Sequence, residues 1–292
     1  MTNDKFLEIL KKYLVNSKNY MSAYGKKHLL NENFYNIYEE LNSGTFEKLN
    51  IKIQIKYYLS FIFRLIIYKN EILTNKFYKI YKKLAKKQNR SLNFDLIRHA
   101  IVLRILNDND VLKGNVCTIG DGKAIFVSGL IENKKINKIF SVNLPQALIQ
   151  DYLIIKKYNL IDPNLIKIVE RDEDIDNSHK LFLIPAENKK MLIMKDINLF
   201  VNMASFQEMP ITETQTYLDI IKTNQSYLYS LNREEKKMYD GEIINYYDYK
   251  IREKSKKIIF EEQANFYKYY YSSKFPFIHK KVSKIISTLA KF

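Results

Sequence analysis

The sequence contains few of the residues that cross-link or interrupt a chain. A single cysteine, Cys117, among 292 residues excludes a disulfide framework and a zinc site built on cysteines. Tryptophan is absent, and there are only seven glycines and five prolines. Because the first proline is Pro145, no proline breaks a helix before that position. With 46% hydrophobic and 27% charged residues the chain can still bury a core, which excludes an intrinsically disordered protein.

A long uninterrupted apolar run is also missing. The most hydrophobic stretch, residues 53–68, contains Lys56 and Arg64, and its uncharged runs are far shorter than the roughly 20 residues of a membrane-spanning helix. The stretch therefore predicts a buried or amphipathic helix. The N-terminal residues lack the apolar segment of a secretory signal. We expect a cytoplasmic protein, with peripheral contact at the inner membrane surface as an open alternative.

Positive charge exceeds negative charge, and the formal net charge is +16. Of the 48 basic residues only seven are arginine, and the abundance of Lys, Asn, Ile and Tyr is typical of AT-rich coding. Residues 1–90 hold 18 basic and 7 acidic side chains and residues 250–292 hold 11 and 3, so the middle is nearly neutral. No nucleic-acid-binding motif is present, and we expect no nucleic-acid partner. Contact of the basic ends with an anionic membrane and formation of a homo-oligomer stay open.

Apolar residues recur at helical spacing through the first 110 residues. The pattern predicts helices near residues 34–41, 51–73, 75–87 and 94–105, and it indicates an N-terminal helical region over residues 1–93.

The pattern changes at about residue 115, where apolar runs alternate with helical segments. This alternation predicts βαβ units and a doubly wound, Rossmann-like α/β sheet in a domain over residues 94–292. Thr212 and Gln215 have the spacing of a capping box, and the chain beyond Lys250 is expected to be helical and basic. The predicted strands are 115–119, 138–145, 180–188, 197–205 and 226–232, and the predicted helices between them are 145–159 and 212–225.

Four of the seven glycines lie between Gly114 and Gly129, which points to a ligand at a tight turn. Gly120-Asp121-Gly122 follows an apolar strand and precedes a helix, and in a doubly wound sheet the ligand lies beyond the carboxyl ends of the strands. A nucleoside would need a ribose partner about 20 residues later, where Asn143 stands. The alternatives are that the glycines form a mere turn and that Asn143 is an ordinary turn residue.

The four histidines, His28, His99, His179 and His279, are widely spaced and form no metal-binding motif, so no metal is expected. No Ser/His/Asp signature is present either.

Several blocks of the sequence resemble one family. These are VNLPQALIQDYLIIKKY, LFLIPAEN, DINLFVNMASFQEMPITETQTYLDII and YLYSLNREEKKMYDGE, and the most specific are SFQEM at 205–209 and LNR at 231–233. Together they are similar to bacterial sugar O-methyltransferases, which resemble class I S-adenosylmethionine methyltransferases. The resemblance covers about residues 95–250 and, more loosely, the segment around Pro276-Phe277.

The resemblance implies S-adenosylmethionine as cofactor and a sugar hydroxyl of a surface polysaccharide or its precursor as acceptor. The glycine turn would hold the methionine end of the cofactor, Asn143 would face the ribose, and residues 202–209 would line the methyl-transfer site. The residues assigned to the cofactor are Gly120, Asp121, Gly122, Asn143, Leu144, Asn202 and Ala204, and those assigned to the substrate are Arg233 and Ser205.

Glu208 follows the fourth predicted strand at the sheet edge that would face the ligand, so it is the candidate base that takes the hydroxyl proton. Gln207 would orient a hydroxyl or the cofactor, and Arg233 would bind a sugar, phosphate or carboxylate. The competing interpretations are a helix N-terminal carboxylate for Glu208, simple exposure for Gln207, and a structural salt bridge for Arg233.

The chain departs from the family pattern in two places. An acidic residue usually precedes a richer glycine turn, whereas Thr118 and Asp121-Gly122-Lys123 stand here. The second strand usually ends in an Asp-Leu-Pro-Glu-like sequence, whereas this chain has amides at Asn143 and Gln146. These departures support an alternative hypothesis, in which the chain is a catalytically degenerate methyltransferase-fold protein with a binding or assembly role.

Overall fold

A computed structural model of the whole chain describes residues 5–13, 75–88, 94–238, 241–271, 278–280 and 283–292, with single residues between 55 and 72. The helix expected at 34–41 and most of the segment 51–73 lie outside these described residues. The described residues of the N-terminal region are nearly all helical, as predicted. No helix in the described part of the chain is long and apolar enough to cross a membrane.

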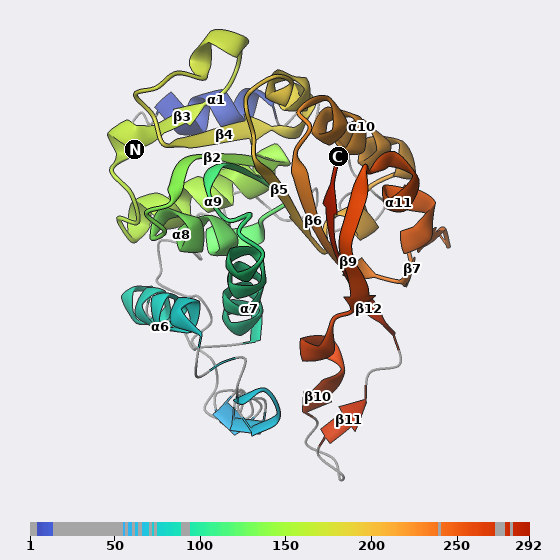
Figure 1. Cartoon of the computed structure of the whole chain (residues 1–292). Helices are drawn as coiled ribbons and strands as arrows, with labels where there is room; N and C mark the ends of the chain where they lie inside the picture. The colour runs from blue at the N-terminus through green and yellow to red at the C-terminus, as the bar shows by residue number, and fades with distance from the viewer. Residues whose placement is uncertain are drawn as a thin grey trace.

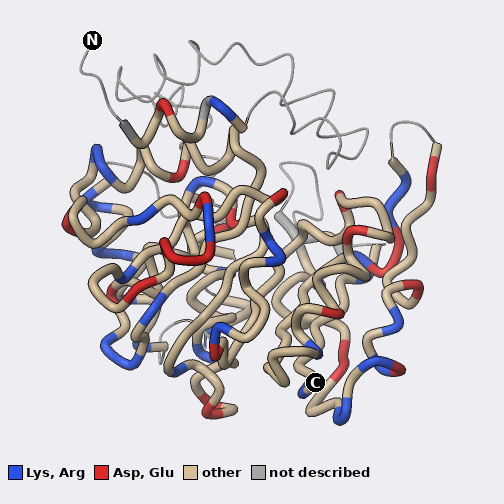
Figure 2. Tube along the Cα trace, turned by 90° about the horizontal axis from the view of Figure 1, so that it is seen from above, with Lys and Arg blue, Asp and Glu red and all other residues tan. Residues whose placement is uncertain are grey.

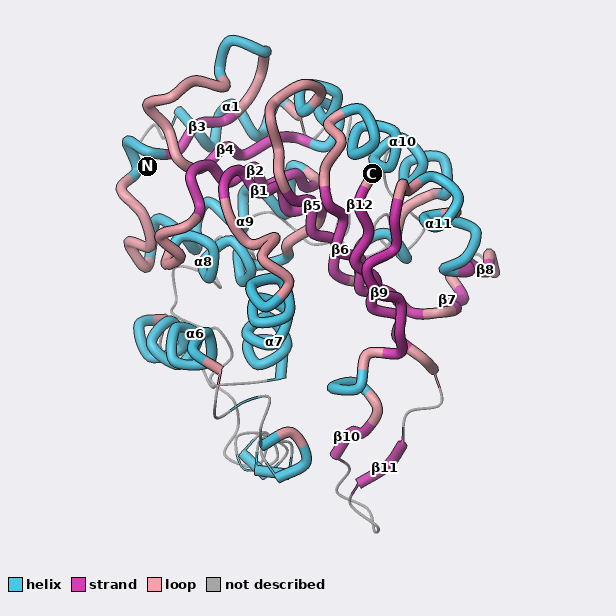
Figure 3. The backbone as a smooth tube through the Cα atoms, in the orientation of Figure 1, coloured by secondary structure: helices cyan, strands magenta, loops and turns pink. Residues whose placement is uncertain are grey.

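The fold is built on an eight-stranded sheet with the order β3-β4-β2-β1-β5-β6-β12-β9 (Figures 1 and 3). The first six strands in this order pair in parallel, and β12 pairs antiparallel with both β6 and β9. The strands are β1 (Gly114–Ile119), β2 (Ile136–Asn143), β3 (Ile166–Ile168), β4 (Leu181–Pro185), β5 (Leu199–Met203), β6 (Tyr227–Arg233), β9 (Lys257–Gln263) and β12 (Ile285–Lys291).

Helices cover both faces of this sheet (Figure 1), which confirms the doubly wound, Rossmann-like fold. One face packs against α7, α8 and α9, and the other against α10 and α11. The helices are α1 (Lys5–Lys12), α6 (Lys76–Lys87), α7 (Phe94–Asp108), α8 (Ile125–Ile131), α9 (Pro145–Lys157), α10 (Ile211–Thr223) and α11 (Ile251–Lys254).

The central parallel strands are mostly apolar because both faces of a parallel sheet are buried. Along β1, Val116 faces the core under α7, α8 and α9, whereas Cys117 and Ile119 face the core under α10. On the second face the rings of Phe140 and Phe182 stack with their centroids 5.1 Å apart. Packing of this kind holds the carboxyl ends of β1, β2 and β5 in fixed positions.

Two sequence predictions are wrong. The chain beyond Lys250 is not a helical end, because α11 is the only α-helix among its described residues and β9 and β12 join the main sheet. Their sequences, KIIFEEQ and IISTLAK, are rich in β-branched residues, which favour strands. The capping box at Thr212 is also absent, because α10 begins at Ile211 with Pro210 in the capping position and without a side-chain cap.

The edge strand β3 and two short strand pairs were not predicted. Strand β3 lies at the edge of the sheet, and two short antiparallel pairs stand apart from it. The pairs are β7 (Glu235–Lys237) with β8 (Ile243–Asn245), and β10 (Tyr269–Tyr271) with β11 (Ile278–Lys280). Such three-residue strands carry too little periodicity to be recognised in a sequence.

Candidate functional site

The predicted site residues gather at one edge of the sheet because β1, β2 and β5 are adjacent and parallel. The glycine turn follows β1, Asn143 ends β2, and the segment 204–209 follows β5. From β1 the chain runs outward to β2 on one side, whereas from the neighbouring β5 it runs outward to β6 on the other side, which makes the gap between β1 and β5 a topological switch point. Crevices outside the carboxyl ends of such strands are where doubly wound folds bind ligands.

The backbone of the turn is left-handed at three positions. Gly120 has a φ of 75°, and Lys123 and Ala124 have φ values of 64° and 49°, which side chains rarely adopt. A Cβ added to Gly120 would lie 2.4 Å from Ser205 Cβ, so this glycine allows the β5 segment to approach. A Cβ on Gly122 would meet nothing within 4 Å, so the open side of the turn lies there.

Two buried carboxylates occupy the hydrogen-bond donors at the start of α8. The Asp121 carboxylate accepts from Phe126 N at 3.0 Å and from Val127 N at 2.7 Å. The Asp151 carboxylate, which reaches over from α9, accepts from Ala124 N at 2.6 Å. A helix N-terminus is normally a site for a ligand anion, and here the chain's own anions fill it.

Burial makes these two carboxyl groups weak acids. It raises the pKa of Asp121 to about 6, and it raises the pKa of Asp151 well above the usual value, with repulsion from Asp121 as a second cause. Hydrogen bonds from the backbone oppose both shifts. The two carboxyl groups therefore resist ionising together, since that would place two like charges in a buried site.

Asn143 is half-buried, and its amide is partly used within the chain. Its Oδ1 accepts from Leu144 N at 2.9 Å and its Nδ2 donates to the Asp121 carbonyl at 3.2 Å. The amide also hydrogen-bonds the Asp151 carboxyl group, which lowers the pKa of that group. A primary amide has two hydrogens and two acceptor positions, so one acceptor position remains for a ligand hydroxyl. Leu144 offers no polar side chain and directly precedes α9.

The segment after β5 is held by a buried polar network centred on Asn202. Asn202 has no exposed surface, its Nδ2 contacts Ser205 Oγ and donates to the Ile119 carbonyl at 3.2 Å, and its Oδ1 accepts from Asn232 Nδ2 at 2.9 Å. Ser205 Oγ donates to the same Ile119 carbonyl at 2.7 Å. The network joins the ends of β1, β5 and β6, and Asn202 contributes by fixing this geometry.

The three candidates for catalysis and substrate binding lie in different environments. Gln207 is buried, not simply exposed, and its Oε1 accepts from Arg233 N at 2.8 Å. Glu208 is partly exposed and pairs with Lys236 Nζ at 2.7 Å. The Arg233 side chain is exposed, and it forms no ion pair within 4.0 Å among the described residues. Ala204 adopts a φ of 66°, which turns the chain toward Ser205.

S-Adenosylmethionine, implied by the resemblance, requires room beside the turn, a ribose partner and groups that suit its charged amino-acid end. Gly122 provides room and Asn143 provides one free acceptor position for a ribose hydroxyl. The charge nearest the turn belongs to Asp121 and Asp151, which suits a cationic ammonium or sulfonium better than a carboxylate. The residues fit the cofactor, with fewer free polar groups than the family pattern has.

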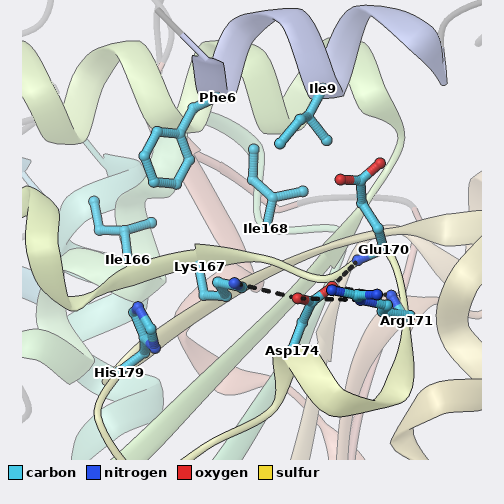
Figure 4. A pocket seen from close by; sticks show the side chains of 9 residues that line it. All are labelled: Phe6, Ile9, Ile166, Lys167, Ile168, Glu170, Arg171, Asp174 and His179. Carbon is cyan, nitrogen blue, oxygen red and sulfur yellow. Dashed lines mark hydrogen bonds and ion pairs between the residues drawn. The ribbon is translucent and has the colours of Figure 1, made fainter.

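A cavity of about 590 Å³ lies elsewhere, between α1 and the edge strand β3 (Figure 4). Phe6, Ile9 and Ile168 form its apolar side, and Lys167 and Asp174 form an ion pair of 3.2 Å on the other. Since β4 and β2 separate β3 from β1, this cavity is distinct from the glycine turn.

Sequence reasoning missed two residues of the site, Asp151 and Asn232. Asp151 is the only acidic residue of α9, three residues after Leu148 and four before Ile155, both buried. That spacing puts Asp151 on the buried face of the helix, and a charged residue on a buried face is the signal that could have identified it. Asn232 stands in the apolar strand β6 and gave a similar signal. Within the described residues no cluster of His, Cys, Asp and Glu could hold a metal.

Comparison with known proteins gives similarities to solved structures only. No protein-family model matches the chain, and no curated protein matches it. A methyltransferase of Clostridium acetobutylicum that depends on S-adenosylmethionine is 11% identical with a TM-score of 0.45, covering 75% of this chain and 99% of that one. The N-methyltransferase NodS of Bradyrhizobium japonicum is 11% identical with a TM-score of 0.42, covering 68% and 96%. The methyltransferase domain of the bacterial protein CtHen1 is 10% identical with a TM-score of 0.42, covering 68% and 100%. Similarity at this level carries no conclusion about activity.

Proposed function

We propose that this chain is an S-adenosylmethionine-dependent methyltransferase that acts on a hydroxyl of a sugar in a surface polysaccharide or its precursor. One observation carries the proposal: the glycine turn, Asn143 and the segment 204–209 converge at the switch point of a doubly wound sheet. The sugar acceptor rests on the sequence resemblance, whose most specific blocks, 205–209 and 231–233, lie at this same edge.

When bound, the cofactor supplies an electrophilic methyl group, and the protein's task is to position the acceptor oxygen and to remove its proton. Glu208 is the proposed base, and its ion pair with Lys236 at 2.7 Å holds the carboxylate in position. The exposed guanidinium of Arg233 is the proposed contact for the sugar or for an attached phosphate. Gln207 positions Arg233 by accepting its backbone N–H.

Titration calorimetry with S-adenosylmethionine and with its demethylated product tests the cofactor site. We expect Asn143→Ala to weaken binding about tenfold, through the lost ribose hydrogen bond, and Asn143→Asp to strengthen it. Asn109→Ala, an exposed asparagine at the amino end of β1, is the matched control and leaves binding unchanged. No binding by either the natural chain or Asn143→Asp at millimolar cofactor would refute the proposal.

A second candidate function is a non-catalytic binding or assembly role for the same fold. The specific observation in its favour is that Asp121 and Asp151 already accept hydrogen bonds from the start of α8. The same calorimetry separates the two functions, because only the enzyme requires cofactor binding. Loss of methyl transfer to a sugar acceptor in Glu208→Gln, with cofactor binding intact, would then support the enzyme.

A further inference from the structure

Helix α6 presents a face made only of lysine. Phe77, Tyr81, Leu84 and Ala85 bury one side of this helix, and no acidic residue occurs anywhere in its 12 residues. The opposite side carries six exposed lysines, here called the lysine face: Lys76, Lys79, Lys82, Lys83, Lys86 and Lys87.

The positive charges of the lysine face repel one another. Lys79 and Lys83, Lys82 and Lys86, and Lys83 and Lys87 are each four residues apart, so their charges are neighbours on the helix surface. Only Lys83 has a carboxylate partner among the described residues, Glu132 at 3.6 Å. On the face of the α/β body seen in Figure 2, by contrast, basic and acidic residues are mixed. A surface helix with this composition is destabilised by its own charges unless an anion neutralises them.

Further lysines extend the positive surface beyond α6. Lys87 Nζ donates to the Asn159 carbonyl at 2.7 Å, which places the end of α6 beside the end of α9. Lys156 and Lys157 are exposed in that last turn of α9. Positive charge therefore continues from one helix to the next.

An exposed apolar stripe lies just before α6 in the chain. Ile55, Tyr58, Leu59 and Ile66 are all helical, and they are 54%, 64%, 37% and 67% exposed. Their spacing puts them on one face of a helix. In Figure 1 the helical residues between 55 and 72 and α6 lie at the same end of the molecule, below the sheet.

One hydrogen bond ties this segment to a distant part of the protein. Tyr68, which is buried, donates from its hydroxyl to the Asn265 carbonyl at 2.8 Å. A local turn joins the segment to α6, since Asn75 N donates to the Ile72 carbonyl at 3.2 Å. The apolar stripe therefore stays exposed on a segment that is held at Tyr68 and leads directly into the helix with the lysine face.

We propose that the apolar stripe and the lysine face together form a docking surface for a lipid bilayer that carries anionic headgroups. Apolar side chains on a helix enter the boundary between headgroups and acyl chains, and lysines beside them attract anionic lipids. This pairing of features is what an interfacial membrane surface requires, and it is independent of what the glycine turn binds.

A nucleic acid is a poorer fit to the same surface. Phosphate and base recognition draws on arginine forks, and the lysine face contains no arginine. Exposed isoleucine and leucine contribute nothing to a phosphate backbone, whereas a bilayer buries them. Nucleic-acid binding is therefore an outcome that the experiment must be able to reveal.

Co-sedimentation with vesicles tests the proposal on the full chain. We expect binding to phosphatidylcholine vesicles that contain phosphatidylserine, weakening with added salt, and much weaker binding to phosphatidylcholine alone. Replacing Lys79, Lys82 and Lys86 by Gln should lower the partition coefficient about 100-fold, at about fivefold per lysine. The same three positions changed to Arg should retain binding. Leu59→Ser with Ile66→Ser should lower it about tenfold without any change in charge.

Two matched controls use exposed residues elsewhere. Lys222, Lys250 and Lys257 changed together to Gln remove the same charge, and Met194→Ser with Ile259→Ser removes exposed apolar surface. Both controls should bind like the natural chain.

Three results would overturn the proposal: equal binding to neutral and anionic vesicles, no loss in the lysine variant, or equal losses in the controls. Tighter binding to a DNA or RNA duplex than to anionic vesicles, unaffected by the apolar variant, would overturn it in favour of a nucleic-acid surface. Because no readout involves S-adenosylmethionine, failure here and failure of the proposed function are distinguishable.

Discussion

The close contact between Gly120 and Ser205 allows a quantitative test of how the candidate site is built. We consider Gly120→Ala, which adds one Cβ at a φ of 75° and 2.4 Å from Ser205 Cβ. The left-handed backbone costs about 1–2 kcal/mol with a side chain, and forcing an extra carbon into a packed site costs about 1–3 kcal/mol. We therefore expect the free energy of unfolding to fall by about 3 kcal/mol, measured by urea denaturation.

A double-mutant cycle separates the two contributions. Ser205→Gly removes the atoms that the new Cβ would meet, so Gly120→Ala with Ser205→Gly should be less destabilised than the sum of the single changes, by about 1–3 kcal/mol. Ser205→Ala keeps its own Cβ and should give no such recovery. Each Ser205 variant also loses the 2.7 Å hydrogen bond to the Ile119 carbonyl, which contributes about 1 kcal/mol. The single Ser205 variants measure this loss, so it can be subtracted in the cycle.

Gly122→Ala is the internal control. A Cβ there meets nothing within 4 Å and the backbone is not left-handed, so stability should change by less than about 1 kcal/mol. If S-adenosylmethionine lies beside the turn, Gly122→Ala should nevertheless weaken its binding. The reasoning fails if Gly120→Ala costs no more than Gly122→Ala, or if the cycle with Ser205→Gly shows no coupling.

Three further predictions concern buried groups. The raised pKa of Asp151 means that its contribution to stability is present at low pH and is lost as the pH rises through the raised value. Asp151→Asn should therefore lose less stability to urea than the natural chain as the pH is raised from about 5 to about 8. A flat pH profile of the natural chain over that range would contradict this. Gly129→Ala would place a Cβ 2.4 Å from the Tyr81 hydroxyl, and thermal unfolding should show a loss of about 2 kcal/mol that Tyr81→Phe partly restores. Lys189→Met would leave Glu213 without its ion-pair partner at 2.9 Å, and the free energy of unfolding in urea should fall by about 2 kcal/mol. Adding Glu213→Gln should recover most of this loss. No recovery would show that the packing of the lysine stem matters and its charge does not.

The parts of the fold that could be predicted from the sequence are those with a local signal. Helix α6 was predicted over 75–87 and spans Lys76–Lys87, because its apolar face repeats at helical spacing and Asn75 caps it. Strands β1, β2, β4, β5 and β6 were predicted because each is a short apolar run beside a turn signal. Their alternation with helices was enough to predict the doubly wound sheet.

The parts that were missed depend on contacts distant in sequence. Whether IISTLAK forms a helix or a strand is decided by its pairing with β6, whose Tyr227 lies opposite Lys291. Asp151 meets the glycine turn only after α9 folds back on α8, 27 residues from Ala124. The predicted site residues do gather at the switch point, because their strands are neighbours in the sheet. How their polar groups are used within the chain depends on distances between side chains, which the spacing of residues in the sequence does not give.

The insertion of β12 between β6 and β9 has a consequence for how the protein is made. When β6 leaves the ribosome its outer edge has no partner, and more than 50 further residues are synthesised before β12 can reach it. Strand β9 emerges earlier and cannot attach to the sheet until β12 arrives between them. While those residues are made, the nascent chain therefore carries an open strand edge, which is the kind of edge that pairs with other chains. The speed with which β12 pairs once it has emerged, and protection of the β6 edge by chaperones until then, should govern how much folded protein a cell obtains.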